Sequence, residues 1–315
     1  MRKFKNVIIT GPTGAIGMAL IDCLTSNGIN VTAVVNPASK RIDRIKENDK
    51  VSIIKCDLKD IERLPELINE ARREGHNITD TYDVFYHFAW MNTFGQGRDD
   101  ISSQMDNVKY AMLAMDAAKA LGVKLFIGAG SQAEYGRCKD ALRSDTPTFP
   151  ETGYGIAKLA AGQFGKIRAR QLGMEFIWTR ILSIYGPFDG DKTLVQSMIS
   201  KLKAGEVPET TKGEQIWDFL YSKDAANAFY LIAKNGKNEK TYVIGSGIGR
   251  PLREYIEDIR DVVCPEADIN FGAIPYSEKQ VMHLLADISE LKEETGFIPQ
   301  TDFKEGIKSL LHNDH

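Results

Sequence analysis

The chain has 315 residues, of which 43% are hydrophobic and 26% charged, and its formal net charge is -3. These values are ordinary for a soluble globular protein, and the length suffices for one large domain or a domain with a smaller lobe. The weakly acidic balance argues against nucleic-acid binding and against a polybasic membrane anchor, and no apolar run approaches the roughly 18 residues of a transmembrane helix.

Cysteine spacing and the start of the chain favour a reducing compartment. The four cysteines lie far apart without a CxxC pair, which favours free thiols over a zinc site or a disulfide framework. The basic start leads into only four apolar residues, too few for a signal peptide. We therefore expect a cytoplasmic protein that holds no metal.

Short β-branched runs alternate with helical patterns through the first half of the chain. Strands are predicted at residues 7–10, 31–35, 51–55, 84–88, 124–128 and 176–181. Helices are predicted at residues 16–26, 61–74, 105–121 and 155–172. Alternation of near-continuous apolar strands with helices predicts an α/β fold with a doubly wound, parallel Rossmann sheet.

The alternation loosens after residue 187. A single strand is predicted at residues 241–244, and helices at 194–204, 222–234, 252–263 and 303–312. We interpret this part as a smaller, interleaved C-terminal substrate-binding lobe. The expected dinucleotide-binding domain then covers residues 1–182 with a return segment at about 220–246, and the lobe covers 183–219 and 247–315.

The segment GPTGAIG, residues 11–17, lies between the first strand and the first helix. Gly11 permits a tight turn, Gly14 lets the backbone approach a diphosphate, and free N–H groups at the helix start face the anion. A GxxGxxG spacing alone is a weak signal, but here it has the strand-turn-helix context of a dinucleotide site. The predicted cofactor contacts in this turn are Gly11, Thr13, Gly14, Ala15 and Ile16.

The end of the second strand bears on which dinucleotide binds. NAD sites usually carry an acidic side chain there, whereas NADP sites favour a cation for the 2′-phosphate. Here Asn36 is uncharged, and Ser39, Lys40 and Arg41 offer donors and positive charge. We predict NADP, with NAD possible, although the same residues also suit a solvated polar loop.

Tyr154 and Lys158 lie four residues apart, hence on one face of a helix. An ammonium beside the phenol would lower the pKa of Tyr154 and make it an acid or base for hydroxyl–carbonyl interconversion. Ser131 follows the fifth strand, at the sheet edge where ligands bind, and can hydrogen-bond the reacting oxygen. His87 ends the fourth strand, where a packed, hydrogen-bonded histidine is more common than an acid–base catalyst.

Together with YxxxK and GxxGxxG, several ordered motifs resemble the extended short-chain dehydrogenase/reductase family, in particular its sugar-nucleotide branch. The motifs are CDL (56–58), HFA (87–89), Asn107, RILSIYGP (180–187), GEQIWDF (213–219) with Asp224, and TGFIP (295–299). The resemblance spans nearly the whole chain. It implies further cofactor contacts from Asp57, Leu58, Phe88, Ala89, Trp90, Asn107, Ala129, Tyr154, Lys158 and Ile181.

The resemblance also implies a catalytic trio, in which Tyr154 exchanges the proton, Lys158 tunes it and binds the nicotinamide ribose, and Ser131 orients the carbonyl. The family's 4,6-dehydratases carry an Asp-Glu pair after the catalytic Ser or Thr. Here Gln132 and an alanine occupy those positions, so dehydration is not expected.

Two further departures fall where the family contacts the substrate's diphosphate or nucleotide. Ser183 replaces an Asn and Trp217 replaces an Arg, which removes a bidentate phosphate clamp. Trp217 can stack on a base or sugar, or serve only as an anchor in the lobe core. The expected substrate contacts are Ser131, Gln132, Ser183 and Trp217.

These features predict an NADP(H)-dependent reductase of a 4-keto-6-deoxy nucleotide sugar, working in deoxysugar biosynthesis. An NAD-dependent nucleoside-diphosphate-sugar epimerase is the first alternative, and a dinucleotide-sensing regulator without turnover is the second. The resemblance implies a homodimer formed through the helices at 105–121 and 155–172.

Overall fold

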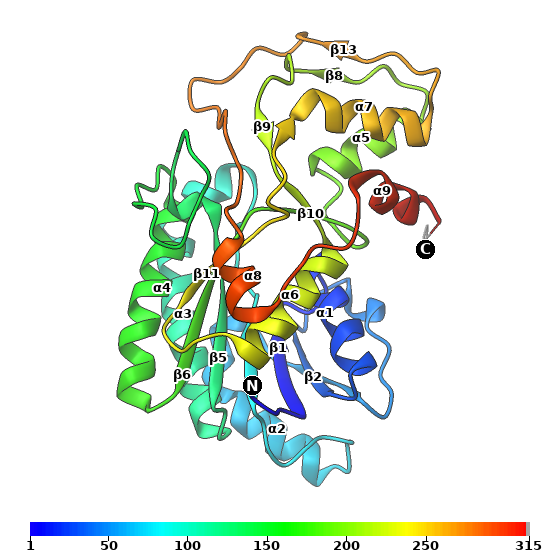
Figure 1. Ribbon diagram of the computed structural model, residues 1–315. Coiled ribbons are helices and arrows are strands. Elements are labelled where there is room, and N and C mark those ends of the chain that lie inside the picture. Colours follow the sequence, from blue (N-terminus) through cyan, green and yellow to red (C-terminus); the bar gives the residue numbers. More distant parts are fainter. Residues whose placement is uncertain (313–315) are drawn as a thin grey trace.

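A seven-stranded sheet forms the base of the protein, and the computed structural model describes residues 1–312 (Figure 1). The strands are β1 Asn6–Thr10, β2 Asn30–Val35, β3 Val51–Lys55, β4 Val84–His87, β5 Leu125–Ser131, β6 Glu175–Ile181 and β11 Thr241–Ile244. All neighbouring pairs are parallel, in the order β11-β6-β5-β4-β1-β2-β3. The order reverses between β1 and β4, which confirms the doubly wound Rossmann fold.

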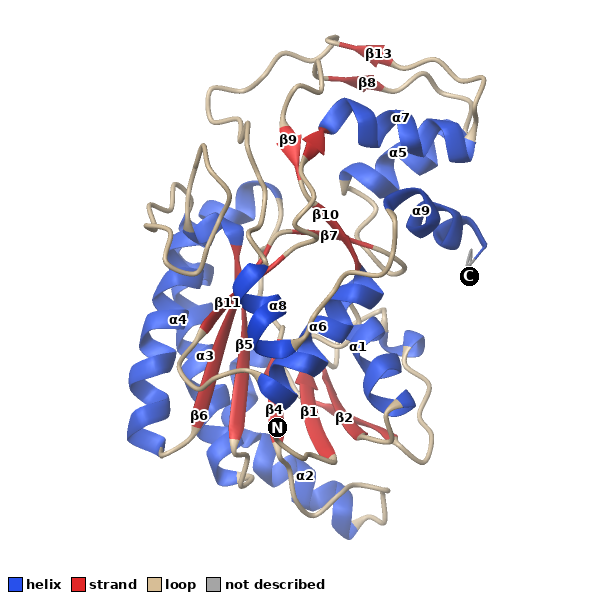
Figure 2. Cartoon of the chain, in the orientation of Figure 1, coloured by secondary structure: helices blue, strands red, loops and turns tan. Residues whose placement is uncertain are grey.

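Helices cover both faces of this sheet (Figure 2). One face carries α1 Ala15–Ser26, α6 Ser222–Asn235 and α8 Ser289–Thr295. The other face carries α2 Leu64–Arg73, α3 Ile101–Ala120 and α4 Gly153–Leu172. Because both faces are buried, the strands are mostly apolar, which is why the sequence predicted them well.

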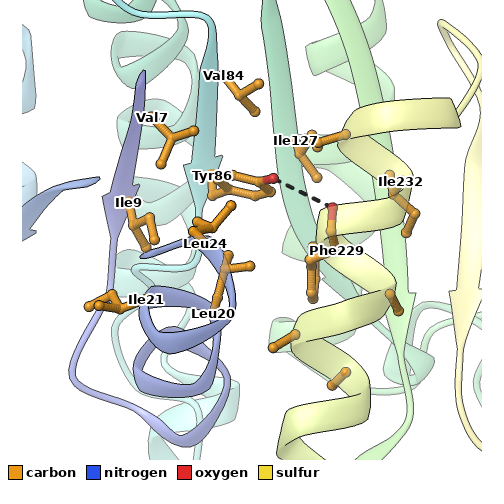
Figure 3. Close-up of a cluster of buried hydrophobic side chains, with 14 of the residues drawn as sticks. Val7, Ile9, Leu20, Ile21, Leu24, Val84, Tyr86, Ile127, Phe229 and Ile232 are labelled. Atoms are coloured by element: carbon orange, nitrogen blue, oxygen red, sulfur yellow. Dashed lines mark hydrogen bonds between the residues drawn. The ribbon is translucent and has the colours of Figure 1, made fainter. Parts of the chain in front are cut away.

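Side chains of each strand point alternately to the two faces. Val7 and Ile9 of β1 join the cluster under α1 and α6, whereas Ile8 joins the cluster under α2, α3 and α4. Figure 3 shows the first of these clusters, where the hydroxyl of Tyr86 donates a hydrogen bond of 3.5 Å to the carbonyl of Phe229. The sheet therefore has two separate cores, one on each face.

Capping residues explain where two helices begin. Asp100 accepts a hydrogen bond from the backbone N–H of Ser103, so α3 begins four residues earlier than its apolar pattern indicates. Thr152 accepts one from the N–H of Gly155 and starts α4 two residues early. In place of the helix predicted at 61–74, the structure has a 3-10 turn, η2 Leu58–Arg63, followed by α2, and Asp60 departs from helical geometry within that turn.

The upper lobe in Figure 1 is built from helices and very short strands. Its helices are α5 Leu194–Lys203, α7 Leu252–Val263 and α9 Phe303–His312. Its strand pairs are β7 Ser183–Tyr185 with β10 Phe219–Tyr221, β9 Ile216–Trp217 with β12 Arg250–Pro251, and β8 Glu209–Thr210 with β13 Asn270–Phe271. Strands of two or three residues are too short to show a periodicity, so the sequence did not predict them.

The chain passes repeatedly between the sheet and the lobe. After α6 it returns to form β11 at the sheet edge and then re-enters the lobe at β12. Asp218 lies at this passage, where its buried carboxylate accepts backbone hydrogen bonds from Ser246, Gly247 and Ala286 at 2.7–3.1 Å.

The four cysteines are free thiols. Within residues 1–312, no helix combines the length and the apolar character that a membrane crossing requires.

Candidate functional site

A pocket of about 260 Å³ lies at the carboxyl ends of β1 to β4. This is the sheet edge at which doubly wound folds bind ligands, next to the reversal of strand order. Eight of the predicted cofactor residues line it, namely Gly11, Thr13, Asn36, Ser39, Leu58, Phe88, Ala89 and Trp90.

The glycine turn fits a dinucleotide by its geometry. Gly11 has φ +68°, and a Cβ there would lie 2.7 Å from the backbone N of Ala89. A Cβ on Gly14 would meet nothing within 4 Å, and no side chain caps the start of α1. The N–H groups of the first helical turn, which include Ala15 and Ile16, are therefore free to bind a diphosphate.

The end of β2 presents polar but uncharged groups to the pocket. Asn36 donates to the carboxylate of Asp57 at 3.3 Å, and Ser39 lines the pocket beside it. Lys40 lines a neighbouring groove, and Arg41 lies in an exposed loop. No acidic side chain is found among the described residues that line the pocket.

Two elements, β5 and α4, bring the predicted catalytic trio together. Ser131 ends β5, and Tyr154 and Lys158 lie one turn apart on α4. The phenol of Tyr154 is hydrogen-bonded to Ser131. Lys158 is only 3% exposed, and its Nζ donates to the carbonyl of Ala129 at 2.6 Å. Ile181 ends β6 directly beside Ser131 in the sheet register.

The pKa of Tyr154 differs from the sequence prediction. Burial raises the pKa of this phenol above its ordinary value, while the hydrogen bond with Ser131 and the charge of Arg98 act in the opposite direction. Lys158 Nζ lies 5.7 Å from the centre of the Tyr154 ring, and burial lowers the pKa of this amine to about 7. An amine with that pKa is only partly charged at neutral pH, so the expected lowering by a full ammonium was wrong for the protein alone.

The segment after β4 covers the lysine and is anchored on α3. The ring centre of Trp90 lies 3.7 Å from Lys158 Nζ, and its indole N–H donates to Gln104 at 2.9 Å. Asn107 is fully buried and bonds both the N–H and the carbonyl of Met91, at 2.9 and 3.0 Å. Asn107 therefore holds the backbone of the pocket wall.

Glu134 lies in the helical turn that follows Ser131, but its carboxylate points into the interior. It is fully buried and accepts hydrogen bonds from the N–H of Ser131 at 2.9 Å, from Trp178 Nε1 at 3.0 Å and from Arg180 Nε at 2.7 Å. Each of its oxygens is thus engaged inside the fold. Glu134 orients Ser131 and is not placed to exchange a proton with a ligand.

The two departures from the family pattern in the lobe form a single hydrogen-bonded pair. Trp217 Nε1 donates to the hydroxyl of Ser183 at 2.8 Å. The tryptophan is partly buried and packs against both the lobe core and a smaller cluster around Leu284. One edge of the Trp217 ring therefore anchors the lobe, and the side chain is only partly buried, so its contact with a substrate stays a prediction.

Sequence reasoning missed Arg98. It belongs to the 3-10 turn η3, Gly95–Asp99, and its Cζ lies 4.7 Å from the centre of the Tyr154 ring. The available signal was a lone arginine in a glycine-rich loop after a strand end.

His87 is packed in the interior with its Nδ1 2.9 Å from the hydroxyl of Thr10, and burial lowers its pKa to about 3.

Comparison with known proteins agrees with this geometry. The NAD dependent epimerase/dehydratase family matches residues 7–245. CDP-abequose synthase of Salmonella typhimurium is 26% identical over 97% of both chains, and a provisionally named UDP-glucose 4-epimerase of Methanocaldococcus jannaschii is 25% identical over 97% of both. The relatives also include dTDP-glucose 4,6-dehydratases.

Solved structures show the same fold. UDP-N-acetylglucosamine 4-epimerase from Methanobrevibacter ruminantium superimposes with a TM-score of 0.85 at 24% identity, covering 99% of this chain and 98% of that one. Taken with the glycine turn and the Ser-Tyr-Lys trio, the match over residues 7–245 shows that this chain belongs to the NAD-dependent epimerase/dehydratase family of sugar-nucleotide-modifying enzymes.

Proposed function

We propose that the protein interconverts a hydroxyl and a carbonyl on the sugar of a nucleoside diphosphate sugar, using NAD(P). The observation that carries the proposal is the meeting of Ser131, Tyr154 and Lys158 beside the dinucleotide pocket. When bound, the nicotinamide would take up or return the hydride. Ser131 would then orient the sugar oxygen, and Tyr154 would remove or return its proton.

Lys158, one turn further along α4, would assist this proton transfer. With a pKa of about 7 it gains or loses its proton easily near neutral pH. Its present contacts are the Ala129 carbonyl and the face of Trp90. A ribose hydroxyl offered at this position would compete for the same amine protons, so cofactor binding and the position of Trp90 are expected to be linked.

Dehydration is not part of the proposal. Elimination of water needs an acid and a base next to the catalytic serine, and Gln132 and Ala133 are neither. The nearest carboxylate is that of Glu134, which is buried and bonded to Arg180. The relatives that are 4,6-dehydratases therefore share the fold and family of this chain, and we expect them to differ in the reaction.

Two net reactions remain, and the comparisons move epimerisation ahead of the reduction that the sequence favoured. UDP-sugar 4-epimerases recur among the relatives and matched structures. In an epimerase the hydride returns to the opposite face of the same sugar, so no reductant is consumed. We propose 4-epimerisation of a nucleoside-diphosphate hexose as the first candidate.

Reduction of a 4-keto-6-deoxy nucleotide sugar is the second candidate, because of the cofactor pocket. No carboxylate is found among the described residues that line it, and Asn36 and Ser39 occupy the end of β2. That arrangement suits NADP, which is normally supplied as a consumable reductant. The relative that makes CDP-abequose is compatible with such a role.

One assay separates the two candidates. Purified protein is incubated with UDP-, CDP-, dTDP- and GDP-hexoses without added cofactor, and with the corresponding 4-keto-6-deoxy sugars plus NADPH or NADH. Isomerisation without added cofactor supports the epimerase, and stoichiometric oxidation of NADPH supports the reductase. Absence of both, by a protein that binds the dinucleotide, would contradict the proposed function.

Arg41→Ala tests the choice of cofactor in the same preparation. If Arg41 neutralises a 2′-phosphate, its loss should weaken NADPH binding about tenfold, because a charge-assisted hydrogen bond is removed, and leave NADH binding nearly unchanged. Isothermal titration with both dinucleotides measures this. Equal effects on the two would remove Arg41 from the cofactor site.

A further inference from the structure

Arg98 has no carboxylate partner among the described residues. Its Nε is buried without a hydrogen-bond partner, and within residues 1–312 its guanidinium has no ion pair. Buried arginine nitrogens are normally bonded to a carboxylate or a carbonyl. The contact that this guanidinium does make is with the face of the Tyr154 ring, 4.7 Å from Cζ to the ring centre.

The backbone of η3 is held firmly enough to fix this contact. Gln104 is 2% exposed and donates to the carbonyls of Asn92 and Gly97, at 3.0 and 3.1 Å. Asp99 accepts a hydrogen bond of 2.8 Å from the N–H of Gly153, the residue before Tyr154. The two neighbours of Arg98 in the chain are thus held, Gly97 by α3 and Asp99 by the first turn of α4.

The other groups that face the phenol do not supply a steady positive charge. Ser131 is a neutral hydrogen-bond partner, and the carboxylate of Glu134 acts to raise the pKa of Tyr154. Lys158 has a pKa of about 7 and is therefore only partly charged. Asp99 adds a negative charge at the start of the helix. Arg98 is left as the permanent cation beside the ring.

We propose that Arg98 is a positioning residue for Tyr154, whose guanidinium lies on the ring face and stabilises the phenolate. A cation over the face of an aromatic ring is attracted by the ring's electrons, and the attraction grows when the ring carries a negative charge. The inference rests on the proposed role of Tyr154 as the proton-exchanging group. It adds a second source of phenolate stabilisation, from the loop after β4, to the lysine on α4.

The test reads the ionisation of residue 154 directly and needs no substrate. A fluorinated tyrosine, whose phenol is intrinsically more acidic, is incorporated at position 154 so that its titration falls where the protein is folded. The single fluorine resonance is then followed against pH. Arg98→Met should raise the pKa of this phenol by about one pH unit or more, because it removes an opposite charge 4.7 Å from the ring centre.

Three further variants separate charge from structure. Arg98→Lys should raise the pKa of the phenol less than Arg98→Met does, since it retains a cation on a shorter side chain, whereas Arg98→Gln should behave like Arg98→Met. Arg73→Met, at an exposed site on α2, removes the same charge from the chain and should leave the titration unchanged. Should Arg98→Met fail to fold, the Lys and Gln variants still give different expectations.

An unchanged titration in both Arg98→Met and Arg98→Gln would overturn the proposal, and so would an equal shift in Arg98→Lys and Arg98→Gln. Once a substrate is in hand, the pH profile of kcat adds a second measurement. Its limb for the basic form of Tyr154 should move to higher pH in Arg98→Met. Because the titration needs no turnover, failure to find a nucleotide-sugar substrate would count against the proposed function and not against this inference.

Discussion

Tyr154 is surrounded by groups that act on its proton in opposite directions. Burial and Glu134 raise the pKa of the phenol, whereas Ser131 and Arg98 lower it. A phenol in this balance donates a proton readily to a developing alkoxide, and it needs help to act as a base. In the proposed reaction, the direction of proton transfer would therefore depend on charges contributed by the neighbours of Tyr154.

Tyr154→Phe tests the central role of this residue. Turnover should fall about a hundredfold or more, because a positioned acid–base group is lost, while dinucleotide binding should change little. Steady-state rates and isothermal titration measure the two quantities. Retained turnover would show that another group exchanges the proton.

Trp217→Ala tests whether the Trp217–Ser183 pair belongs to the substrate site. Loss of the ring should raise KM for the substrate roughly tenfold, because a stacking surface is removed. Ser183→Ala is the companion variant, since it breaks the 2.8 Å hydrogen bond and leaves the ring in place, so the two variants separate the effect of the ring from that of the hydroxyl. An unchanged KM together with a lower free energy of unfolding would assign Trp217 to the lobe core alone.

At the scale of elements, loops between a strand and the next helix carry the candidate site. The glycine turn, the segment after β4 and the turn after β5 all leave the same edge of the sheet. Each loop is held by bonds to a neighbouring helix or strand, such as those from Gln104 and Asn107 on α3. Rigid strands and anchored loops together explain how side chains distant in sequence meet within a few ångströms.

Gly11→Ala tests how closely the glycine turn is packed. Gly28 is a suitable control because it also has positive φ, +76° against +68°, but a Cβ there would meet nothing within 4 Å. Gly28→Ala should cost about 1 kcal/mol of unfolding free energy from backbone strain. Gly11→Ala should cost at least about 2 kcal/mol more, because its Cβ would collide with the backbone of Ala89. Urea denaturation of both variants measures this, and equal losses would contradict the close packing.

At the scale of the whole molecule, buried ionisable groups couple stability to pH. His87 is 2% exposed, and its pKa is lowered to about 3 by burial, with a smaller effect from Lys158. Since the folded state resists protonation that the unfolded chain accepts near its ordinary value, stability should fall as the pH drops from about 6.5 towards 3. The native core is therefore expected to weaken in mild acid.

His87→Gln isolates that contribution. Between pH 7 and pH 5 the wild-type protein should lose about 2 kcal/mol more stability than the variant, which has no imidazole to protonate. Urea denaturation at the two pH values measures the difference. A loss of the same size in both proteins would show that His87 does not contribute to the acid sensitivity.

Exposed apolar side chains gather on two helices at the outside of the sheet. They are Ile101 and Met105 of α3 and Ile156, Phe164 and Ile167 of α4. Such a surface is typical of a contact between subunits. The homodimer through these helices stays a prediction, as do the domain bounds set out from the sequence.

Three features were predictable from the sequence. They are the alternation of strands and helices along the chain, the glycine turn, and the shared helix face of Tyr154 and Lys158. Each depends on local properties, namely β-branched runs, helical periodicity and a spacing of four residues. The seven sheet strands agree with the prediction to within a few residues. The two- and three-residue strands of the lobe were not predictable, because their pairing involves segments far apart in the chain.

The tertiary structure alone decided the electrostatics of the site. Lys158 was expected as a full ammonium, but burial under Trp90 lowers its pKa to about 7. Arg98 contacts the ring of Tyr154, which is more than fifty residues away in the sequence, and Glu134 accepts a hydrogen bond from Arg180 of β6. Charge states depend on burial and on distances between remote segments. The sequence by itself therefore indicated Ser131, Tyr154 and Lys158 as candidates, and the fold decided which other groups surround them and how each of them is charged.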